Sequence, residues 1–172
     1  MRESAEADFA EFYAATWSRT LAVTYAMTGD RGAAEELAQE AYVRAWSRWR
    51  TVSGYEQPAA WVRQVATRLS VSRWRRRKVA AAWFARNRHE RVVDPPDETS
   101  AALVQALLLI PEAQRRAIVL HHLADLPVDE VARIEHTPVG TIKARLSRGR
   151  TSLAALLAED AADEPNGEPT HV

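Results

Sequence analysis

Hydrophobic side chains recur every three or four residues along most of this 172-residue chain, which is the period of an amphipathic α-helix. The pattern predicts helices over residues 8–27, 31–49, 58–77, 99–109, 112–124, 128–135 and 138–157. We therefore expect an all-α protein.

The breaks between these segments carry helix start and stop signals. Gly29 suits the left-handed position that follows a helix, and Asp30 can accept from the first free amides of the next one. Residues 50–57 are an expected loop, and Pro58 suits a first helical position.

Periodicity is lost over residues 79–98, which end in Asp94-Pro95-Pro96-Asp97. This predicts two small helical bundles joined by a flexible linker, the second containing a helix-turn-helix. The expected boundaries are 8–78 for the first bundle, 79–98 for the linker and 99–158 for the second bundle. The tail, 159–172, is acidic and contains glycine and proline, so we expect it to be disordered.

Charge is unevenly distributed, although the formal net charge of the chain is zero. Residues 1–50 carry a net −2, residues 51–97 a net +6, residues 98–158 a net +1 and residues 159–172 a net −5. Local fields govern contact with a polyanion, so neutrality of the whole chain does not exclude nucleic acid. The absence of cysteine excludes a disulfide framework and suits a reducing compartment. No signal peptide or membrane-length apolar run is evident, so we expect no membrane insertion.

Residues 127–150 have the pattern of a helix-turn-helix: a short helix, a tight turn and a second helix that carries basic residues. Thr137 can cap the second helix and Pro138 can preset its first turn. Its expected buried stripe consists of Ile142, Leu146, Gly149, Leu153 and Leu156. The opposite face carries Lys143, Ser147 and Arg150, with Arg145 and Arg148 beside it. Such residues contact phosphates and base edges, so this face predicts a DNA reader.

Two other patterns are open to a structural or a functional interpretation. The basic run over 73–78 either solubilises a helix end or clamps phosphates, and Tyr55, Trp61 or Trp74 could stack on unpaired bases. The acidic helix over 31–49 is either a solvated face or a docking face for a basic partner.

Catalytic and metal sites are not indicated. His121 and His122 are adjacent, so they point about 100° apart on a helix, and no histidine pair has metal-ligand spacing. Nucleophile-elbow and phosphate-loop signatures are missing. We expect no enzyme activity, no metal and no cofactor.

Two stretches, in order, resemble the small sigma factors of the extracytoplasmic-function (ECF) type, which belong to the sigma-70 family. The first is ELAQEAYVRAW (36–46) with Pro58 and Trp61 after the loop, which is similar to the family pattern DLVQEAFLRAW…W. The second, Leu126 to Arg150, is similar to LSYEEIAEILGIPVGTVKSRLSRAR. With its flanking helices, the resemblance covers residues 8–158.

The resemblance implies a transcription initiation factor that acts in the cytoplasm with core RNA polymerase and promoter DNA as partners, and with an anti-sigma factor as a further candidate partner. The first bundle would contact the β′ clamp helices and the second the β flap. It implies polymerase contacts for Leu37, Gln39, Glu40 and Arg44. It implies −10 and backbone contacts for Val52, Tyr55, Trp61, Arg68, Arg73, Arg75, Arg76, Arg77 and Lys78. The −35 element would be contacted by Thr141, Lys143, Ala144, Ser147 and Arg148, with Arg145 and Arg150 on phosphates.

The chain departs from the family pattern at three places. The family often has an aromatic residue in the −10 loop, where the aligned region of this chain offers Val52 and Tyr55. Arg68 stands where the family often has asparagine. In the turn, Glu135-His136 replaces Leu-Gly; histidine tolerates a left-handed backbone, and Glu135 predicts looser packing.

Two alternatives remain at the level of sequence. One is a regulator that binds DNA alone through 99–158, with 8–77 as a sensor or dimerisation bundle. The other is a helical adaptor without DNA function.

Overall fold

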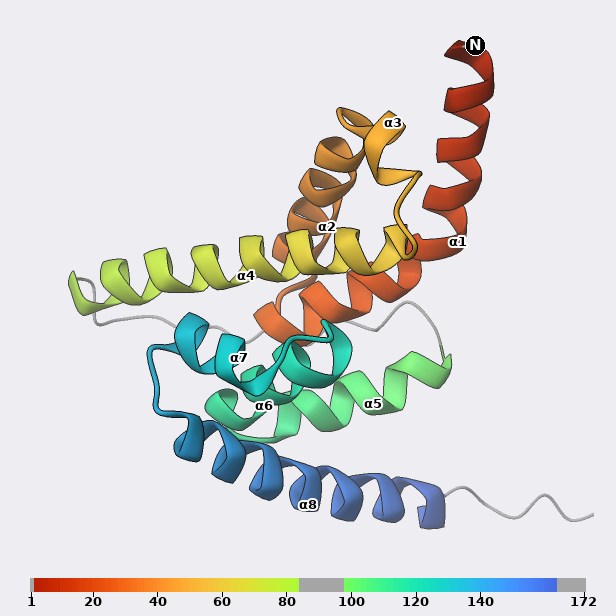
Figure 1. The fold of residues 1–172 in the computed structure, drawn as a ribbon. Helices are drawn as coiled ribbons and strands as arrows, with labels where there is room; N and C mark the ends of the chain where they lie inside the picture. The colour runs from red at the N-terminus through yellow and green to blue at the C-terminus, as the bar shows by residue number, and fades with distance from the viewer. Residues whose placement is uncertain (1, 84–97, 164–172) are drawn as a thin grey trace, which may run out of the picture.

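The computed structural model describes the backbone of residues 2–83 and 98–163, and the side chains of residues 4–77 and 102–158. Every regular element in these ranges is helical, which confirms the all-α prediction (Figure 1). The elements are α1 (Arg2–Thr28), α2 (Arg31–Trp46), α3 (Trp49–Val52), α4 (Pro58–Trp83), α5 (Glu98–Leu109), α6 (Glu112–Ile118), the π-helical turn η1 (Val119–Leu123), α7 (Val128–Glu135) and α8 (Val139–Asp163).

The junction between α1 and α2 forms as its sequence predicts. Gly29 has a φ of +65°, a left-handed conformation that glycine adopts without strain. The Asp30 carboxylate accepts from the Ala33 amide at 2.8 Å and so caps α2. Pro58 is the first residue of α4, where its missing amide hydrogen costs nothing.

Helices α1, α2 and α4 enclose the core of the first half. Its centre is Tyr42, whose hydroxyl lies 2.8 Å from the Thr16 hydroxyl and 3.1 Å from that of Thr20. Burial raises the pKa of Tyr42. Aromatic rings of α1 surround it, among them Phe12 and Tyr13, so this core is built mainly by ring packing.

Helices α5 to α8 enclose the second core, in which the stripe predicted for α8 is buried at Ile142, Leu146 and Leu153. The predicted helix over 112–124 is in fact α6 continued by η1, which ends at Leu123. Two residues later, Asp125 has a left-handed conformation (φ 56°). This widened turn leads the chain into α7.

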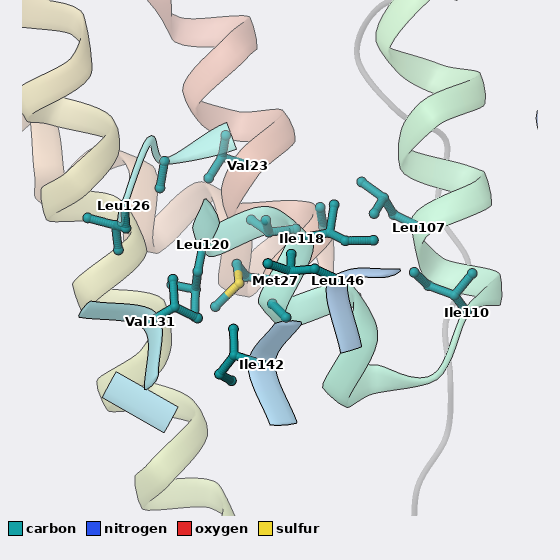
Figure 2. Packing of buried hydrophobic residues seen from close by; sticks show 14 of the residues in the cluster. Val23, Met27, Leu107, Ile110, Ile118, Leu120, Leu126, Val131, Ile142 and Leu146 are labelled. Carbon is teal, nitrogen blue, oxygen red and sulfur yellow. The ribbon is translucent and has the colours of Figure 1, made fainter. Parts of the chain in front are cut away.

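The second core extends into the first half, so the two halves pack against each other. Val23 and Met27 of α1 lie among Ile118, Leu120 and Leu146 of the second half (Figure 2). In Figure 1, α7 lies between α4 and α8, and α2 and α8 lie on opposite sides of the molecule. The bundles are therefore not independent in this conformation, because each covers apolar surface of the other.

Several expected boundaries differ from those observed. Helix α4 extends to Trp83, so its predicted end near residue 77 was wrong, and α3 occupies part of the expected 50–57 loop. The last helix extends to Asp163 rather than 157. Local alanines (Ala80 to Ala82, Ala161 and Ala162) favour helix at both extended ends. Most of the expected linker (84–97) and the expected tail after Asp163 lie outside the described residues.

Candidate nucleic-acid interface

The turn between α7 and α8 contains the left-handed residue that the sequence predicted, but its proline and threonine have other roles than expected. His136 ends α7 with φ 50° and ψ 46°, in the left-handed region. The Pro138 carbonyl accepts from the amides of Thr141 and Ile142 at 2.9 and 3.1 Å. Pro138 thus precedes the first helical residue, Val139, instead of occupying the first turn itself. The Thr137 hydroxyl donates back to the Glu135 carbonyl at 3.1 Å, so it supports the turn.

Helix α8 has its apolar residues on a buried side and most of its polar and basic residues on an exposed side. The buried side carries the stripe described above, with Gly149 packed against α6. Six of the predicted −35 contacts are exposed: Thr141, Lys143, Ala144, Ser147, Arg148 and Arg150. One face of α8 therefore presents donors and cations to solvent, as a helix that enters a DNA groove must.

Arg145 and Glu135 differ from expectation. The Glu135 side chain is only 5% exposed; it accepts a short charged bond from Arg116 and lies 3.7 Å from Arg145. The prediction of looser packing at Glu135 was wrong, because two guanidinium groups neutralise the buried carboxylate. No role was predicted for Arg116 from the sequence. An unusual acid in the turn, with an arginine on the preceding helix, was the signal that could have found it.

The cationic end of α4 divides into two groups. Arg76 and Arg77 are exposed and line a shallow cavity with Asp30 and Arg73. The other group is engaged within the chain. Arg73 pairs with Glu36 of α2 at 2.9 Å, Arg68 with Glu130 of α7 at 3.3 Å, and Arg75 donates to the Ile134 carbonyl. The side chain of Lys78 lies outside the described residues.

Trp74 is the main aromatic contact between the halves. Its indole N–H donates to Glu112 of α6 at 2.7 Å, and the Arg116 guanidinium lies 3.1 Å from its ring centroid. A guanidinium over a tryptophan face is a favourable cation–π geometry. Near the start of α4, Arg63 lies 3.7 Å from Asp125. Burial lowers the pKa of Arg63, and likewise that of Arg116.

In the region predicted to contact the −10 element, two aromatic rings are accessible, but the Val52 side chain is not. Tyr55 is exposed and half-buried Trp61 lies near it, with ring centroids 6.4 Å apart. Val52 is 1% exposed, so its side chain serves the core. Of the two nearby tryptophans, Trp49 is buried, whereas Trp46 is 43% exposed.

Helix α2 presents a mixed face to solvent. Gln39, Glu40 and Arg44 are exposed, and Arg44 donates to Glu40 at 2.6 Å. Val43 is 66% exposed beside them, which is unusual for a large apolar side chain. Leu37, in contrast, is buried and belongs to the core.

Other kinds of site receive no support from the described part of the chain. Among those residues, no three His, Asp or Glu side chains gather in a way that could hold a metal ion. The described helices also include none with both the length and the apolarity that a membrane crossing requires.

Comparison with known proteins agrees with this geometry. Residues 12–79 match the family model described as Sigma-70 region 2, and residues 100–153 match that described as Sigma-70, region 4. The chain is 30% identical over 173 residues to the ECF RNA polymerase sigma factor SigW of Bacillus subtilis, covering 91% of each. It is 26% identical to the ECF sigma factor EcfG of Rhodopseudomonas palustris, over 83% of this chain and 81% of that one.

A solved structure shares the fold. It is the sigma factor RpoE of Bartonella quintana, determined in complex with the anti-sigma factor NepR. The TM-score is 0.62 at 24% identity, over 89% of this chain and 98% of that one. These similarities extend over most of the length of this chain and of each relative. The chain therefore belongs to the ECF group of the sigma-70 family of RNA polymerase sigma factors.

Proposed function

We propose that this chain binds core RNA polymerase and directs it to promoters through two DNA contacts, with α8 in the major groove of a −35 element and α4 with its preceding loop on a −10 element. The observation that carries the proposal is the exposed polar face of α8 behind a helix-turn-helix turn. The chain acts as an initiation factor and performs no catalysis itself. Its place of action is the cytoplasm, where RNA polymerase works.

The residue types on α8 suit base and phosphate contact. Arg148 and Lys143 can donate to guanine edges, and Ser147 can donate to or accept from either partner of a base pair. Arg150 lies farther along the helix and suits a phosphate. The methyl group of Ala144 can contact a thymine methyl.

The −10 contact combines cations with rings. Arg76 and Arg77 are placed to hold the DNA backbone, and Tyr55 and Trp61 can stack on unpaired bases. Arg68, Arg73 and Arg75 are engaged with Glu36 and α7 in this conformation. They join the DNA contact only after those bonds exchange.

Helix α2 is the proposed polymerase contact, through Gln39, Glu40 and Arg44 together with the exposed Val43 and Trp46. Exposed apolar side chains ringed by polar ones are typical of a protein interface. Leu37 supports this surface from the core. The second half would contact the β flap. Since the related RpoE was captured with an anti-sigma factor, this chain is also proposed to have such an inhibitor.

The test is run-off transcription by core polymerase, with and without this chain, on a library of random promoters. A defined set of start sites should depend on the chain. The double variant Lys143→Glu/Arg148→Glu should abolish starts that need a −35 element. Arg133→Glu is the matched control, because Arg133 is an exposed cation of the same half on α7.

Two results would contradict the proposal. One is a chain that neither joins core polymerase nor changes where RNA synthesis begins. The other is tight, sequence-specific DNA binding by the free chain, which would favour a stand-alone regulator. An adaptor would keep its activity in the charge-reversed variant.

A further inference from the structure

One buried carboxylate joins three helices of the second half. Glu135 is the last residue of α7, and its side chain is 5% exposed. One oxygen accepts from Arg116 of α6, and the other lies 3.7 Å from Arg145 of α8. Arg116 is itself 2% exposed at its side chain, and the Trp74 ring of α4 covers part of its guanidinium in this conformation.

The position of Arg145 distinguishes it from its neighbours on α8. Its side chain is 23% exposed, whereas Lys143, Ala144, Ser147 and Arg148 are exposed. Its guanidinium is directed back along the turn to Glu135 instead of outward with the reading face. If Arg145 turned away from Glu135 toward the DNA groove, one oxygen of the Glu135 carboxylate would lose its counter-charge. That loss is costly in a buried site.

We propose that Glu135 is a positioning residue for the −35 reading helix and that Arg145 acts through it without touching phosphate. The carboxylate fixes α8 to α6 and α7 at the turn, where a small rotation would displace Lys143, Ser147 and Arg148 together. This inference rests on the proposed function of α8. It replaces the phosphate contact that the family resemblance implies for Arg145.

The experiment measures how promoter affinity depends on salt, using the holoenzyme of core polymerase and the full chain. The DNA is a promoter selected in the run-off library, held at a temperature at which it stays closed. Each phosphate contact adds about 0.9 to the slope of log affinity against log salt. Arg150→Ala, which removes an exposed cation from the same helix, calibrates the loss of one contact.

Arg145→Ala should lower affinity several-fold at every salt concentration while the slope stays that of the wild type. In the Glu135→Gln background, Arg145→Ala should lower promoter affinity little further, because the carboxylate through which Arg145 acts is already gone. Circular dichroism of each variant verifies that the helices remain formed.

Either of two results would overturn the inference. One is a salt slope of Arg145→Ala that falls as far as the salt slope of Arg150→Ala. The other is a double variant whose loss of promoter affinity equals the sum of the losses from Arg145→Ala and Glu135→Gln. Failure of the proposed function is a separate outcome, since wild-type holoenzyme would then show no promoter-specific binding.

Discussion

Gly149 lies where α8 crosses α6, and its missing side chain sets how closely the two helices approach. A Cβ at this position would lie 2.6 Å from the Ile118 Cδ1 and 3.3 Å from the Gln114 Cβ. Ile118 is 5% exposed, so its end methyl has little room to move. Tight packing here outweighs the helix propensity that alanine would add.

Gly149→Ala should therefore destabilise the protein by about 1 to 2 kcal/mol, the usual size of an overpacking penalty. In an Ile118→Val background the obstructing methyl is gone, and the same change should become neutral or stabilising. Thermal unfolding of the four proteins of this cycle measures the effect. A loss of stability in both backgrounds would show that the contact with Ile118 is not the cause.

His136 gives a second prediction at this scale, because its φ of 50° is unfavourable for any residue with a Cβ. His136→Gly should raise stability by up to about 1 kcal/mol, and His136→Val should lower it, since a branched side chain fits this backbone worst. Chemical denaturation provides the comparison. If valine were tolerated as well as glycine, the turn would not have the left-handed geometry described.

At the scale of elements, α2 has two sides with separate tasks. Its alanines and Tyr42 pack into the first half, and its outer side presents Gln39, Glu40 and Arg44. The outer side chains make few contacts that the fold needs, since an exposed ion pair such as Glu40–Arg44 contributes little to stability. The exposed polar residues are therefore available for a partner.

Gln39→Ala/Arg44→Ala should weaken binding to core polymerase about ten-fold or more and leave the unfolding temperature nearly unchanged. Co-purification and a titration of labelled chain with core polymerase measure the first effect. Arg31→Ala, at the opposite end of α2, is the control. Unchanged polymerase affinity would remove this face from the proposed interface.

At the scale of the whole molecule, each half covers residues of the other that the proposed function uses. Arg75 donates to a carbonyl of α7, and Trp74 stacks on Arg116 while it donates to Glu112. Arg76 and Arg77 are already exposed, but a promoter complex that also uses Arg75 requires its bond to α7 to break. The conformation described is thus a closed one, and polymerase binding should separate the halves.

The absence of cysteine makes this separation measurable, because Ser18→Cys and Ala154→Cys place one dye on each half at exposed positions. Energy transfer between the dyes should be high in the free chain and should fall when core polymerase is added. Trp74→Ala should lower the energy transfer of the free chain even without polymerase. A desolvated cation–π contact contributes about 1 to 2 kcal/mol, enough to change the closed-to-open ratio about ten-fold.

Two further variants make this test selective. Glu112→Ala removes the acceptor of the indole N–H from an exposed position, so it should act in the same direction as Trp74→Ala. Arg76→Ala removes a nearby exposed cation of α4 and should leave energy transfer unchanged. Low energy transfer in the wild-type free chain would show that the closed conformation is not the resting one.

Local patterns in the sequence determined the helices, the caps at Asp30 and Pro58, the left-handed His136 and the two faces of α8, because each depends on residues within a few positions of one another. The family motifs, also short and local, were sufficient to indicate the sigma-factor class. Only the tertiary structure decided which cations have a partner on another helix. Arg68, Arg75 and Arg145 look alike in the sequence to Arg76 and Arg148, yet their partners Glu130, Ile134 and Glu135 come from other helices. Such pairings depend on how the helices pack, and the periodicity of a single helix does not encode them.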